Sequence, residues 1–297
     1  MHTTSTPTIS VIVFVFNHEK YIERSLASIE SQEIDANIEI IIHDDASTDG
    51  SQAIYRNFAQ RSRHTVKIIR QPENKYSKRI SMWPDIIPAC SGDFFALCDG
   101  DDFWISTEKL AHQLHGLMLM PNIDLTFHKV ARVHYSTEAH TGYYGDYGDE
   151  PKLFTAAAVI EGDGGCIPTA SLMCRRGVLD TLPAWFFDQP PVEDYYIQVF
   201  GALKGGALYL PMCAAAYQEG DPQSWSQRTL ANIASANSFE LRFIEYLFHL
   251  RATLAAEFAA NVDKIMLNHY LTLCRQCFTH HAMEDLGKLA KLIEQYR

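Results

Sequence analysis

Aspartates gather at two places in the sequence where they could hold a metal ion. Asp44 and Asp45 follow the run IEIIIH, and Asp99, Asp101 and Asp102 follow or lie just beyond the apolar run FFALC. Short apolar runs of this kind are typical of buried strands, so both groups are expected at strand ends. Carboxylates that meet at one sheet edge repel one another unless hydrogen bonds or a cation compensate, and a bound divalent metal ion does so directly.

The elements that position these aspartates alternate between strand and helix. Residues 9–16 read ISVIVFVF, a continuous apolar run typical of a strand that is buried on both faces. The alternation continues with helices predicted at 18–32 and 51–61 and strands at 38–44, 66–70 and 94–98. This order predicts a βαβαβ unit with a parallel sheet. Ligands of open α/β sheets bind beyond the carboxyl ends of the strands, where the aspartates and the pair Phe16 and Asn17 lie.

The remainder of the chain predicts a mixed region followed by helices. Further helices are expected at 80–90, 106–120 and 192–201, and extended segments at 123–133, 169–175 and 208–216. The stretch 135–165 is rich in Gly, Tyr and Asp and has weak periodicity, which predicts a long loop. From about residue 228 apolar residues recur three or four apart, which predicts a helical C-terminal region.

Charge and composition exclude some classes of protein. The net charge of -11 over 297 residues argues against a nucleic-acid-binding surface, which needs clustered cations. Residues 61–79 form a local basic patch, which is either a solvated surface or an electrostatic funnel for a diphosphate. The opening residues MHTTSTPT do not resemble a secretory signal, and the seven scattered cysteines suit a reducing compartment. We therefore expect a cytoplasmic protein.

Two other metal motifs fit less well. Asp45, Ser47 and Asp49 match the first positions of a calcium-binding loop, but the position that needs a bidentate glutamate is Arg56. Cys274, Cys277 and His281 share one face of a predicted helix, where packing is a better explanation than zinc because no fourth ligand is evident. The glycine-rich loops of P-loop and dinucleotide-binding proteins do not occur at a strand-to-helix junction.

The separate motifs combine into a family resemblance. SVIVFVFNHEKYIERSLASIESQ, IEIIIHDDASTDGS, QPEN and SGDFFALCDGDDFW occur in this order over residues 8–130, and a looser likeness continues over 165–226. This combination resembles the nucleotide-binding half of glycosyltransferase family 2. The resemblance implies an α/β fold of the GT-A type, with a Rossmann-like sheet and a mixed second half. It also implies a nucleoside diphosphate-sugar donor and a Mn²⁺ or Mg²⁺ ion.

The resemblance also assigns roles to residues of the donor site. Phe14 and Phe16 would flank the base, Asp45 would hydrogen-bond it, and Asp99 would lie near the ribose or the sugar. Asp101 and Asp102 would form the metal and diphosphate site. The remaining donor-binding residues carried over by position are Asn17, Lys78 and Arg79.

The catalytic base is expected in the second half. Inverting members of the family use an acidic residue at a helix start, often as Glu-Asp, and the sequence PPVEDYY offers Glu193 and Asp194. By this resemblance Asp194 would accept the proton of the acceptor hydroxyl. Both acids could instead only stabilise a helix N-terminus. Family members often carry Tyr-Arg-x-His near the metal, but this chain has YQEG, which leaves open whether Glu219 or another residue takes the place of the histidine.

The sequence leads to one hypothesis about the function of the chain and two alternatives. Residues 1–226 would form the GT-A catalytic domain and residues 227–297 a helical appendage. The chain would be an inverting hexosyltransferase that uses a UDP-, dTDP- or GDP-sugar, and it would act in bacterial surface polysaccharide assembly. A saccharide or lipid-linked saccharide would be the acceptor, with peripheral contact to the cytoplasmic face of the inner membrane through the basic patch or the C-terminal helices. The rivals are a sugar nucleotidyltransferase and a catalytically degenerate nucleotide-sugar-binding scaffold.

Overall fold

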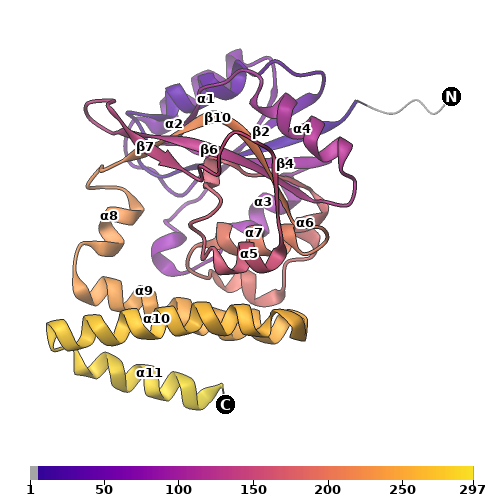
Figure 1. Ribbon diagram of the computed structural model, residues 1–297. Coiled ribbons are helices and arrows are strands. Elements are labelled where there is room, and N and C mark those ends of the chain that lie inside the picture. Colours follow the sequence, from indigo (N-terminus) through magenta and orange to yellow (C-terminus); the bar gives the residue numbers. More distant parts are fainter. Residues whose placement is uncertain (1–5, 297) are drawn as a thin grey trace.

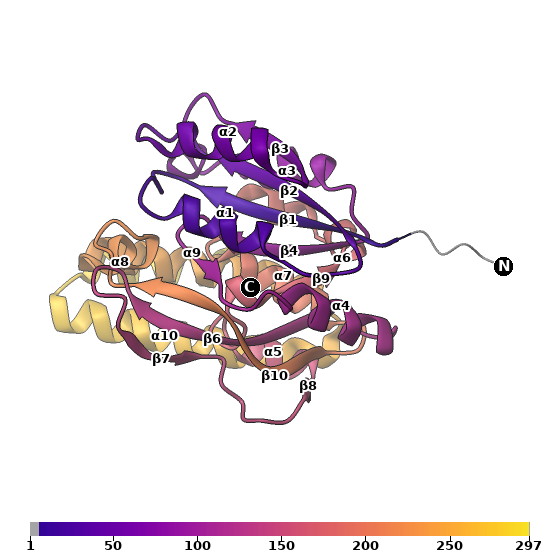
Figure 2. The same ribbon diagram turned by 90° about the horizontal axis from the view of Figure 1, so that it is seen from above.

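The computed structural model describes residues 6–296, and its centre is a twisted sheet flanked by helices (Figures 1 and 2). Within these residues ten strands form one sheet, in which the main path runs β3-β2-β1-β4-β9-β6-β10-β5. The strands are β1 Thr8–Val15, β2 Asn37–Asp44, β3 Thr65–Arg70, β4 Phe94–Asp99, β5 Phe103–Trp104, β6 Leu125–His134, β7 His140–Tyr144, β8 Lys152–Phe154, β9 Met173–Arg175 and β10 Ala207–Glu219.

Helices cover both faces of this sheet. The α-helices are α1 Ile22–Glu30, α2 Ser51–Arg61, α3 Trp83–Ile86, α4 Lys109–Leu119, α5 Ala156–Glu161, α6 Gly177–Asp180, α7 Glu193–Ala202, α8 Trp225–Leu230, α9 Ile233–Thr253, α10 Ala259–His280 and α11 Met283–Gln295. Short 3₁₀ turns are η1 Tyr76–Lys78, η2 Ile87–Ala89, η3 Thr169–Ser171, η4 Ala184–Asp188 and η5 Ala256–Phe258.

The predicted βαβαβ unit is confirmed. Strands β1 to β4 pair in parallel, with β1 between β2 and β4, so their carboxyl ends lie at one edge. Val11 and Val13 of β1 pack in one hydrophobic cluster with Ile22, Leu26 and Ile29 of α1. The buried face of α1 is the one that its helical spacing of apolar residues predicts.

Three segments differ from the expectation, two of them in the second half. The stretch 135–165 is not a long loop, because it contains the strands β7 and β8 and the helix α5. Strand β7 pairs with β6, and β8 pairs with β10. The segment 169–175 begins with the turn η3 before β9. The helix predicted at 80–90 shortens to α3 and η2, since Pro88 has no N–H with which to continue the helical hydrogen bonds.

The C-terminal helices pack on the body rather than extend from it. Figure 1 shows α9 and α10 side by side below α5 and α7, with α11 beneath them. Phe243 and Leu247 of α9 belong to the same buried cluster as Tyr195 and Tyr196 of α7. Within the described residues no helix is both long and apolar enough to cross a membrane.

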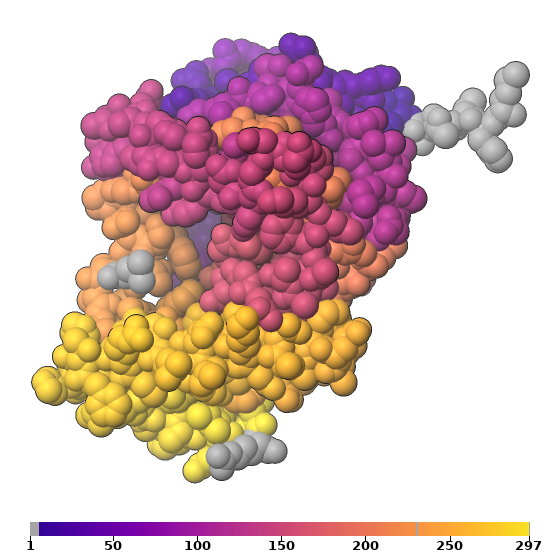
Figure 3. Space-filling view, viewed as in Figure 1, coloured from indigo at the N-terminus to yellow at the C-terminus, as the bar shows by residue number. Residues whose placement is uncertain are grey.

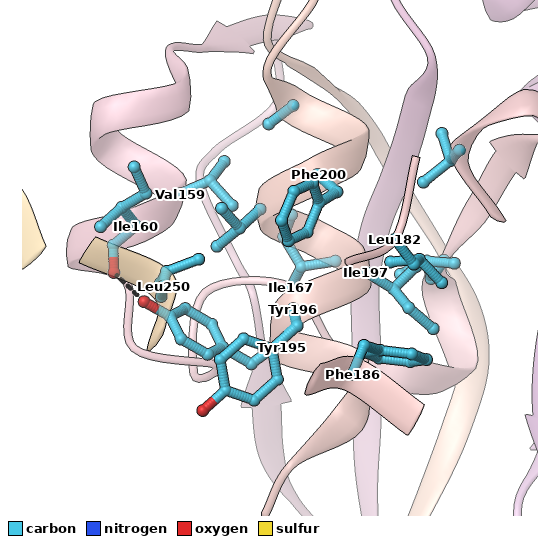
Figure 4. Packing of buried hydrophobic residues seen from close by; sticks show 14 of the residues in the cluster. Val159, Ile160, Ile167, Leu182, Phe186, Tyr195, Tyr196, Ile197, Phe200 and Leu250 are labelled. Carbon is cyan, nitrogen blue, oxygen red and sulfur yellow. Dashed lines mark hydrogen bonds between the residues drawn. The ribbon is translucent and has the colours of Figure 1, made fainter. Parts of the chain in front are cut away.

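Aromatic packing fixes helix α7, which begins with the two acids predicted as catalytic. Figure 4 shows Tyr195 and Tyr196 among Ile160, Ile167 and Leu250, with the Tyr195 hydroxyl directed at the Ile160 carbonyl. That hydroxyl donates a hydrogen bond of 3.0 Å to the carbonyl oxygen. Contacts from both α5 and α9 therefore hold the helix.

Candidate functional site

Asp44 and Asp45 at the end of β2 have different surroundings. Asp44 is fully buried, where its carboxylate accepts hydrogen bonds from the Ser47 amide at 2.8 Å and the Tyr55 hydroxyl at 2.8 Å. Those bonds hold the loop after β2. The Asp45 carboxylate instead accepts bonds from the backbone amides of Lys75 at 2.7 Å and Tyr76 at 3.0 Å. Asp45 thus fastens the segment 74–76 along the edge of the site.

The residues predicted around the base lie at the end of β1. The Phe14 ring is partly exposed and packs edge-on against Trp83, with 5.7 Å between ring centroids. Asn17 adopts a positive φ of 58°, and its side-chain oxygen accepts a hydrogen bond of 2.8 Å from the Thr48 amide. Phe16 is also partly exposed. Asn17 therefore connects the loop after β1 to the loop after β2.

Lys78 and Arg79 lie at the end of η1. The Lys78 ammonium pairs with Glu73 at the surface, and about half of the Lys78 side chain is exposed. Arg79 takes the left-handed conformation that ends the turn, with φ 57°. Other cations of the basic patch are also paired, among them Lys67 with Glu39 at 2.7 Å. Much of the patch charge is thus compensated within the protein.

The DGDD turn follows β4 directly. Pairing of Phe14 with Asp99 in the parallel register sets Asp99 beside the end of β1. A Cβ atom at Gly100 would lie 2.6 Å from His18 Nδ1 and 2.9 Å from the Phe14 carbonyl oxygen, so only glycine fits there. The turn therefore brings its carboxylates close against β1.

These carboxylates raise one another's pKa. Burial, and then the charges of Asp101 and Asp99, raise the pKa of Asp102 well above its usual range. Burial, and then the charges of Asp101 and Asp194, raise the pKa of Asp99. No lysine or arginine is among the groups that act on either carboxyl within the described residues. The turn is thus a cluster of carboxyl groups that no lysine or arginine of residues 6–296 compensates, and the nearest basic side chain is His18, whose Nε2 lies 3.9 Å from Asp101 Oδ2.

Gln218 contacts this turn at the position where the resemblance leads one to expect an arginine. Its backbone amide donates to Asp102 Oδ1 at 3.2 Å, and its side-chain amide donates to the Asp101 carbonyl at 2.8 Å. Glu219 faces away, because its carboxylate accepts a bond of 2.7 Å from Arg132 Nε. The residue that reaches the DGDD turn from β10 is therefore Gln218 and not Glu219.

The carboxyl of Asp194 lies within electrostatic reach of Asp99, as the effect on the pKa of Asp99 shows. Asp194 belongs to the first turn of α7, and Thr169 Oγ1 donates a hydrogen bond of 2.5 Å to its Oδ2. Burial raises the pKa of Asp194, and the Thr169 bond opposes that rise. Val192, just before the helix, has a positive φ of 57°, a strained conformation for a β-branched residue that is typical of functional sites.

Glu193 is the second acid of this helix start. Its Oε1 atom is buried and has no hydrogen-bond partner within the described residues. Burial first, and the neighbouring charge of Asp194 in addition, raise the pKa of Glu193 to about 8. Glu193 is therefore mostly protonated near neutral pH, and Asp194 is the better placed of the two to accept a proton.

The DGDD turn fits a hard divalent cation. The described residues contain no group of three or more His, Cys, Asp and Glu side chains that could hold a metal ion by themselves. Mg²⁺ and Mn²⁺ in phosphate-handling sites typically take one or two carboxylates from the protein and further oxygens from the substrate phosphates. Asp101 and Asp102 supply such a pair, and a cation there would offset the repulsion that raises the pKa of Asp102.

Two contacts around the site were not predicted. Trp225 of α8 donates from its indole nitrogen to the Tyr76 hydroxyl, so α8 reaches the segment held by Asp45. The Tyr21 hydroxyl donates to Asp221 at 2.6 Å, and a cavity of about 330 Å³ lies beside Tyr21 and Gln218. Thr169 and Tyr76 carry no local sequence signal, because their partners are distant in the chain. Among the residues that contact the site, only Gln218 could have been predicted from the sequence, because it belongs to the motif YQEG.

Among proteins of similar sequence, an uncharacterised protein of Mycobacterium tuberculosis (strain H37Rv) is 30% identical over 218 residues. That match covers 73% of this chain and 60% of the relative. An uncharacterised glycosyltransferase of Haemophilus influenzae is 33% identical over 123 residues, which are 40% of this chain and 46% of that protein. The chain thus spans three fifths or less of the length of these curated relatives.

Solved structures establish the likeness of fold. S. aureus TarS 1-349 in complex with UDP-GlcNAc matches with a TM-score of 0.64 at 17% identity, over 92% of this chain and 73% of that one. A mannosyltransferase from Pyrobaculum calidifontis in complex with GDP-Man and Mn²⁺ matches with a TM-score of 0.53 at 15% identity, over 99% and 83%. These neighbours have the GT-A fold, which confirms the predicted fold class.

A family model agrees with the sequence relatives and with the solved structures. The model described as glycosyl transferase family 2 matches residues 10–178, more than half of the chain. This range contains the ends of β1, β2 and β4, where the clustered aspartates lie. The chain therefore belongs to glycosyl transferase family 2.

Proposed function

We propose that this chain is an inverting hexosyltransferase that moves a sugar from a nucleoside diphosphate-sugar to an acceptor hydroxyl. One observation carries the proposal: the DGDD turn after β4 and the acid at the start of α7 lie within electrostatic reach of each other, because the charge of Asp194, after burial and the charge of Asp101, raises the pKa of Asp99. A phosphate-handling cluster and a partly buried base within electrostatic reach of each other are what a single displacement at an anomeric carbon requires.

The donor would lie across the carboxyl ends of β1, β2 and β4. Phe14 and Asp45 would bound the base, and Asp99 would face the ribose or the sugar. Asp101 and Asp102 would hold a Mn²⁺ or Mg²⁺ ion, which supplies charge compensation for the leaving diphosphate when it is bound. The complexes of TarS with UDP-GlcNAc and of the mannosyltransferase with GDP-Man support a UDP- or GDP-sugar as the donor, and a dTDP-sugar is proposed from the family resemblance alone.

Asp194 would accept the proton of the acceptor hydroxyl as its oxygen attacks the anomeric carbon. Thr169 occupies Oδ2 of Asp194 and so orients the carboxylate, while Oδ1 remains for the acceptor. Burial raises the pKa of Asp194, which makes the carboxylate a stronger base than a solvated one. A single displacement of this kind inverts the configuration at the anomeric carbon.

The acceptor is proposed from family membership. We place it among saccharides and lipid-linked saccharides of bacterial surface polysaccharide assembly. With a lipid-linked acceptor the protein would work as a peripheral enzyme at the cytoplasmic face of the inner membrane.

Isosteric replacement of each acid at the start of α7 tests the proposal. Asp194→Asn should lower transfer by roughly 10²- to 10⁴-fold, the usual contribution of a general base, while binding of the donor remains. Glu193→Gln is the matched control. It should lower the rate of transfer less than Asp194→Asn does, because Glu193, with a pKa of about 8, is already mostly protonated at neutral pH. Donor binding is measured by thermal shift with UDP-, dTDP- and GDP-sugars, with and without Mn²⁺.

The same variants separate the rival functions. A sugar nucleotidyltransferase does not need Asp194, so full activity of Asp194→Asn in forming a nucleotide-sugar would favour that rival. A degenerate scaffold would show no turnover at all. Hydrolysis of a nucleotide-sugar in the presence of Mn²⁺ that is abolished by Asp102→Ala would exclude the scaffold.

A further inference from the structure

Helix α10 has an exposed apolar face opposite its buried one. Val262, Met266, Leu273 and Cys277 face the protein interior. Three large apolar side chains lie exposed along the other face, and their exposed fractions are 54% for Leu267, 54% for Leu271 and 64% for Phe278. They are spaced by four and seven residues, so they align on one side of the helix. These three residues are named here the α10 stripe.

The charges around the α10 stripe have one sign. From Lys264 to Met283 the sequence contains no aspartate or glutamate, although the whole chain has a net charge of -11. Arg275 is exposed between Leu271 and Phe278, and the exposed His280 and His281 follow. An apolar stripe bordered by basic residues is the pattern of a helix that lies on an anionic membrane surface.

Acids that border this region are paired with cations. Glu161 of α5 binds the Lys264 ammonium, and Asp263 binds Arg251. Glu284 and Asp285 of α11 both pair with Lys288. Three cations thus face these four acids, and the acids that share one cation, Glu284 and Asp285, lie on α11 and not along the exposed face of α10.

We propose that the α10 stripe docks on the surface of a bilayer that contains anionic phospholipid. The proposal rests on the proposed function in one respect, since a lipid-linked acceptor would require such contact. Of the two regions expected to meet the membrane, the basic patch at 61–79 is less suitable, because its cations Lys67, Lys75 and Lys78 are already paired with protein carboxylates.

A second copy of the chain is a poorer occupant of this face. A two-fold dimer buries the same patch of both subunits, so α10 would meet α10. Arg275 and the histidines of one copy would then face the same basic residues on the other, while the bordering carboxylates already pair with cations of their own chain, which is electrostatically unfavourable. Negatively charged lipid headgroups complement the charge of this surface, whereas α10 of a second copy does not.

Sedimentation with lipid vesicles tests the proposal on the full chain. The protein should bind vesicles of phosphatidylcholine mixed with phosphatidylglycerol more strongly than vesicles of phosphatidylcholine alone, and added salt should weaken that binding. Arg275→Ala should weaken binding about fivefold, as expected for one basic residue near an anionic surface. The double variant Leu271→Glu with Phe278→Glu should weaken it roughly tenfold or more.

Leu119→Glu is the matched control, because Leu119 at the end of α4 is 68% exposed and lies outside the stripe. It should bind vesicles as the wild type does. The proposal is overturned if the wild type does not bind phosphatidylglycerol vesicles, or if Leu119→Glu and the stripe variants lose binding equally. It is also overturned if the wild type is a dimer by size exclusion and only the stripe variants are monomers. Circular dichroism checks folding, and Arg275→Ala carries the test if the double variant does not fold.

Hydrolysis of a nucleotide-sugar in solution separates this proposal from the proposed function. The stripe variants should keep the hydrolysis rate of the wild type, because the stripe lies on the appendage and away from the DGDD turn. Vesicle binding without hydrolysis would refute the proposed function alone. Hydrolysis without vesicle binding would refute the docking surface alone.

Discussion

Single residues of the same type have different roles in this site, depending on their neighbours. Asp44 and Asp45 are adjacent, yet Asp44 is fully buried and bonded to Tyr55, while Asp45 binds the amides of Lys75 and Tyr76. The sequence places both at a strand end and does not distinguish them. What distinguishes them is the alternation of side chains about the strand, together with partners that arrive from other segments.

Thr169 should set the pH dependence of the proposed base. Its hydroxyl stabilises the charged form of Asp194 and so lowers a pKa that burial raises. Thr169→Val removes that bond, so the pKa of Asp194 should rise further. The acidic limb of the profile of kcat/KM against pH should therefore move to higher pH, with roughly a tenfold loss of activity below neutral pH.

A threonine outside the site provides the control for this prediction. Thr181 also donates a hydrogen bond, to the Val178 carbonyl, but it contacts no carboxylate of the site. Thr181→Val should leave the acidic limb where it is. The prediction would be contradicted if Asp194→Asn is inactive but the acidic limb of the pH profile does not move in Thr169→Val. The Thr169 hydrogen bond would then not set the pKa of Asp194.

At the scale of elements, most of the first half of the fold was predictable because its strands β1, β2 and β4 are buried on both faces and so read as apolar runs. The strands β1, β2 and β4 all show this signature. The second half was less predictable, because β7 and β8 are short and mostly exposed, and their pairing with β6 and β10 joins distant segments. The Glu193 and Asp194 pair was found through resemblance alone, and its partner Thr169 was not found.

A buried histidine connects the C-terminal helices to the catalytic half. His269 of α10 contacts Glu240 of α9 at 2.6 Å and Asp163, in the loop after α5, at 3.0 Å. Burial alone would lower the pKa of His269, but the hydrogen bonds and charges of the two carboxylates outweigh burial and raise it to about 9. The imidazolium is thus the charged centre of a three-residue contact between α9, α10 and the loop that leads toward Thr169.

Protein stability should depend on pH through His269. Its folded pKa of about 9 exceeds the unfolded value of 6.5, so its contribution to the free energy of unfolding is fully present below pH 6.5 and lost as pH rises through 9. His269→Gln should therefore lower the free energy of unfolding by roughly 3 kcal/mol below pH 6.5 and by much less above pH 9. Urea unfolding followed by circular dichroism at several pH values measures this difference.

The control variant for this prediction is His280→Gln, since His280 lies on the same helix with an exposed side chain. Its free energy of unfolding should follow that of the wild type at every pH. A difference between wild type and His269→Gln that is the same at pH 6 and pH 10 would mean that packing, and not charge, accounts for the role of His269.

Considered as a whole molecule, the catalytic half and the C-terminal helices share one hydrophobic cluster. Phe243 and Leu250 of α9 and Ile265 of α10 belong to the same buried cluster as Tyr195 and Phe186. The Tyr195 and Phe243 rings stack with 5.7 Å between their centroids. Figure 3 shows the two parts in contact over a broad lower surface. The division into residues 1–226 and 227–297 remains a proposal about chain organisation, and it does not imply two independent cores.

Shared packing of this kind predicts that the chain unfolds as one cooperative unit. Differential scanning calorimetry of the chain should show a single transition, with equal calorimetric and van't Hoff enthalpies. Removal of residues 233–297 should give an insoluble protein, because it uncovers Tyr195 and Tyr196 at the start of α7, which are buried in the intact chain. A second transition, or a soluble truncated protein that still binds the donor, would contradict this prediction and would mean that α7 does not need the C-terminal helices to hold Asp194 in place.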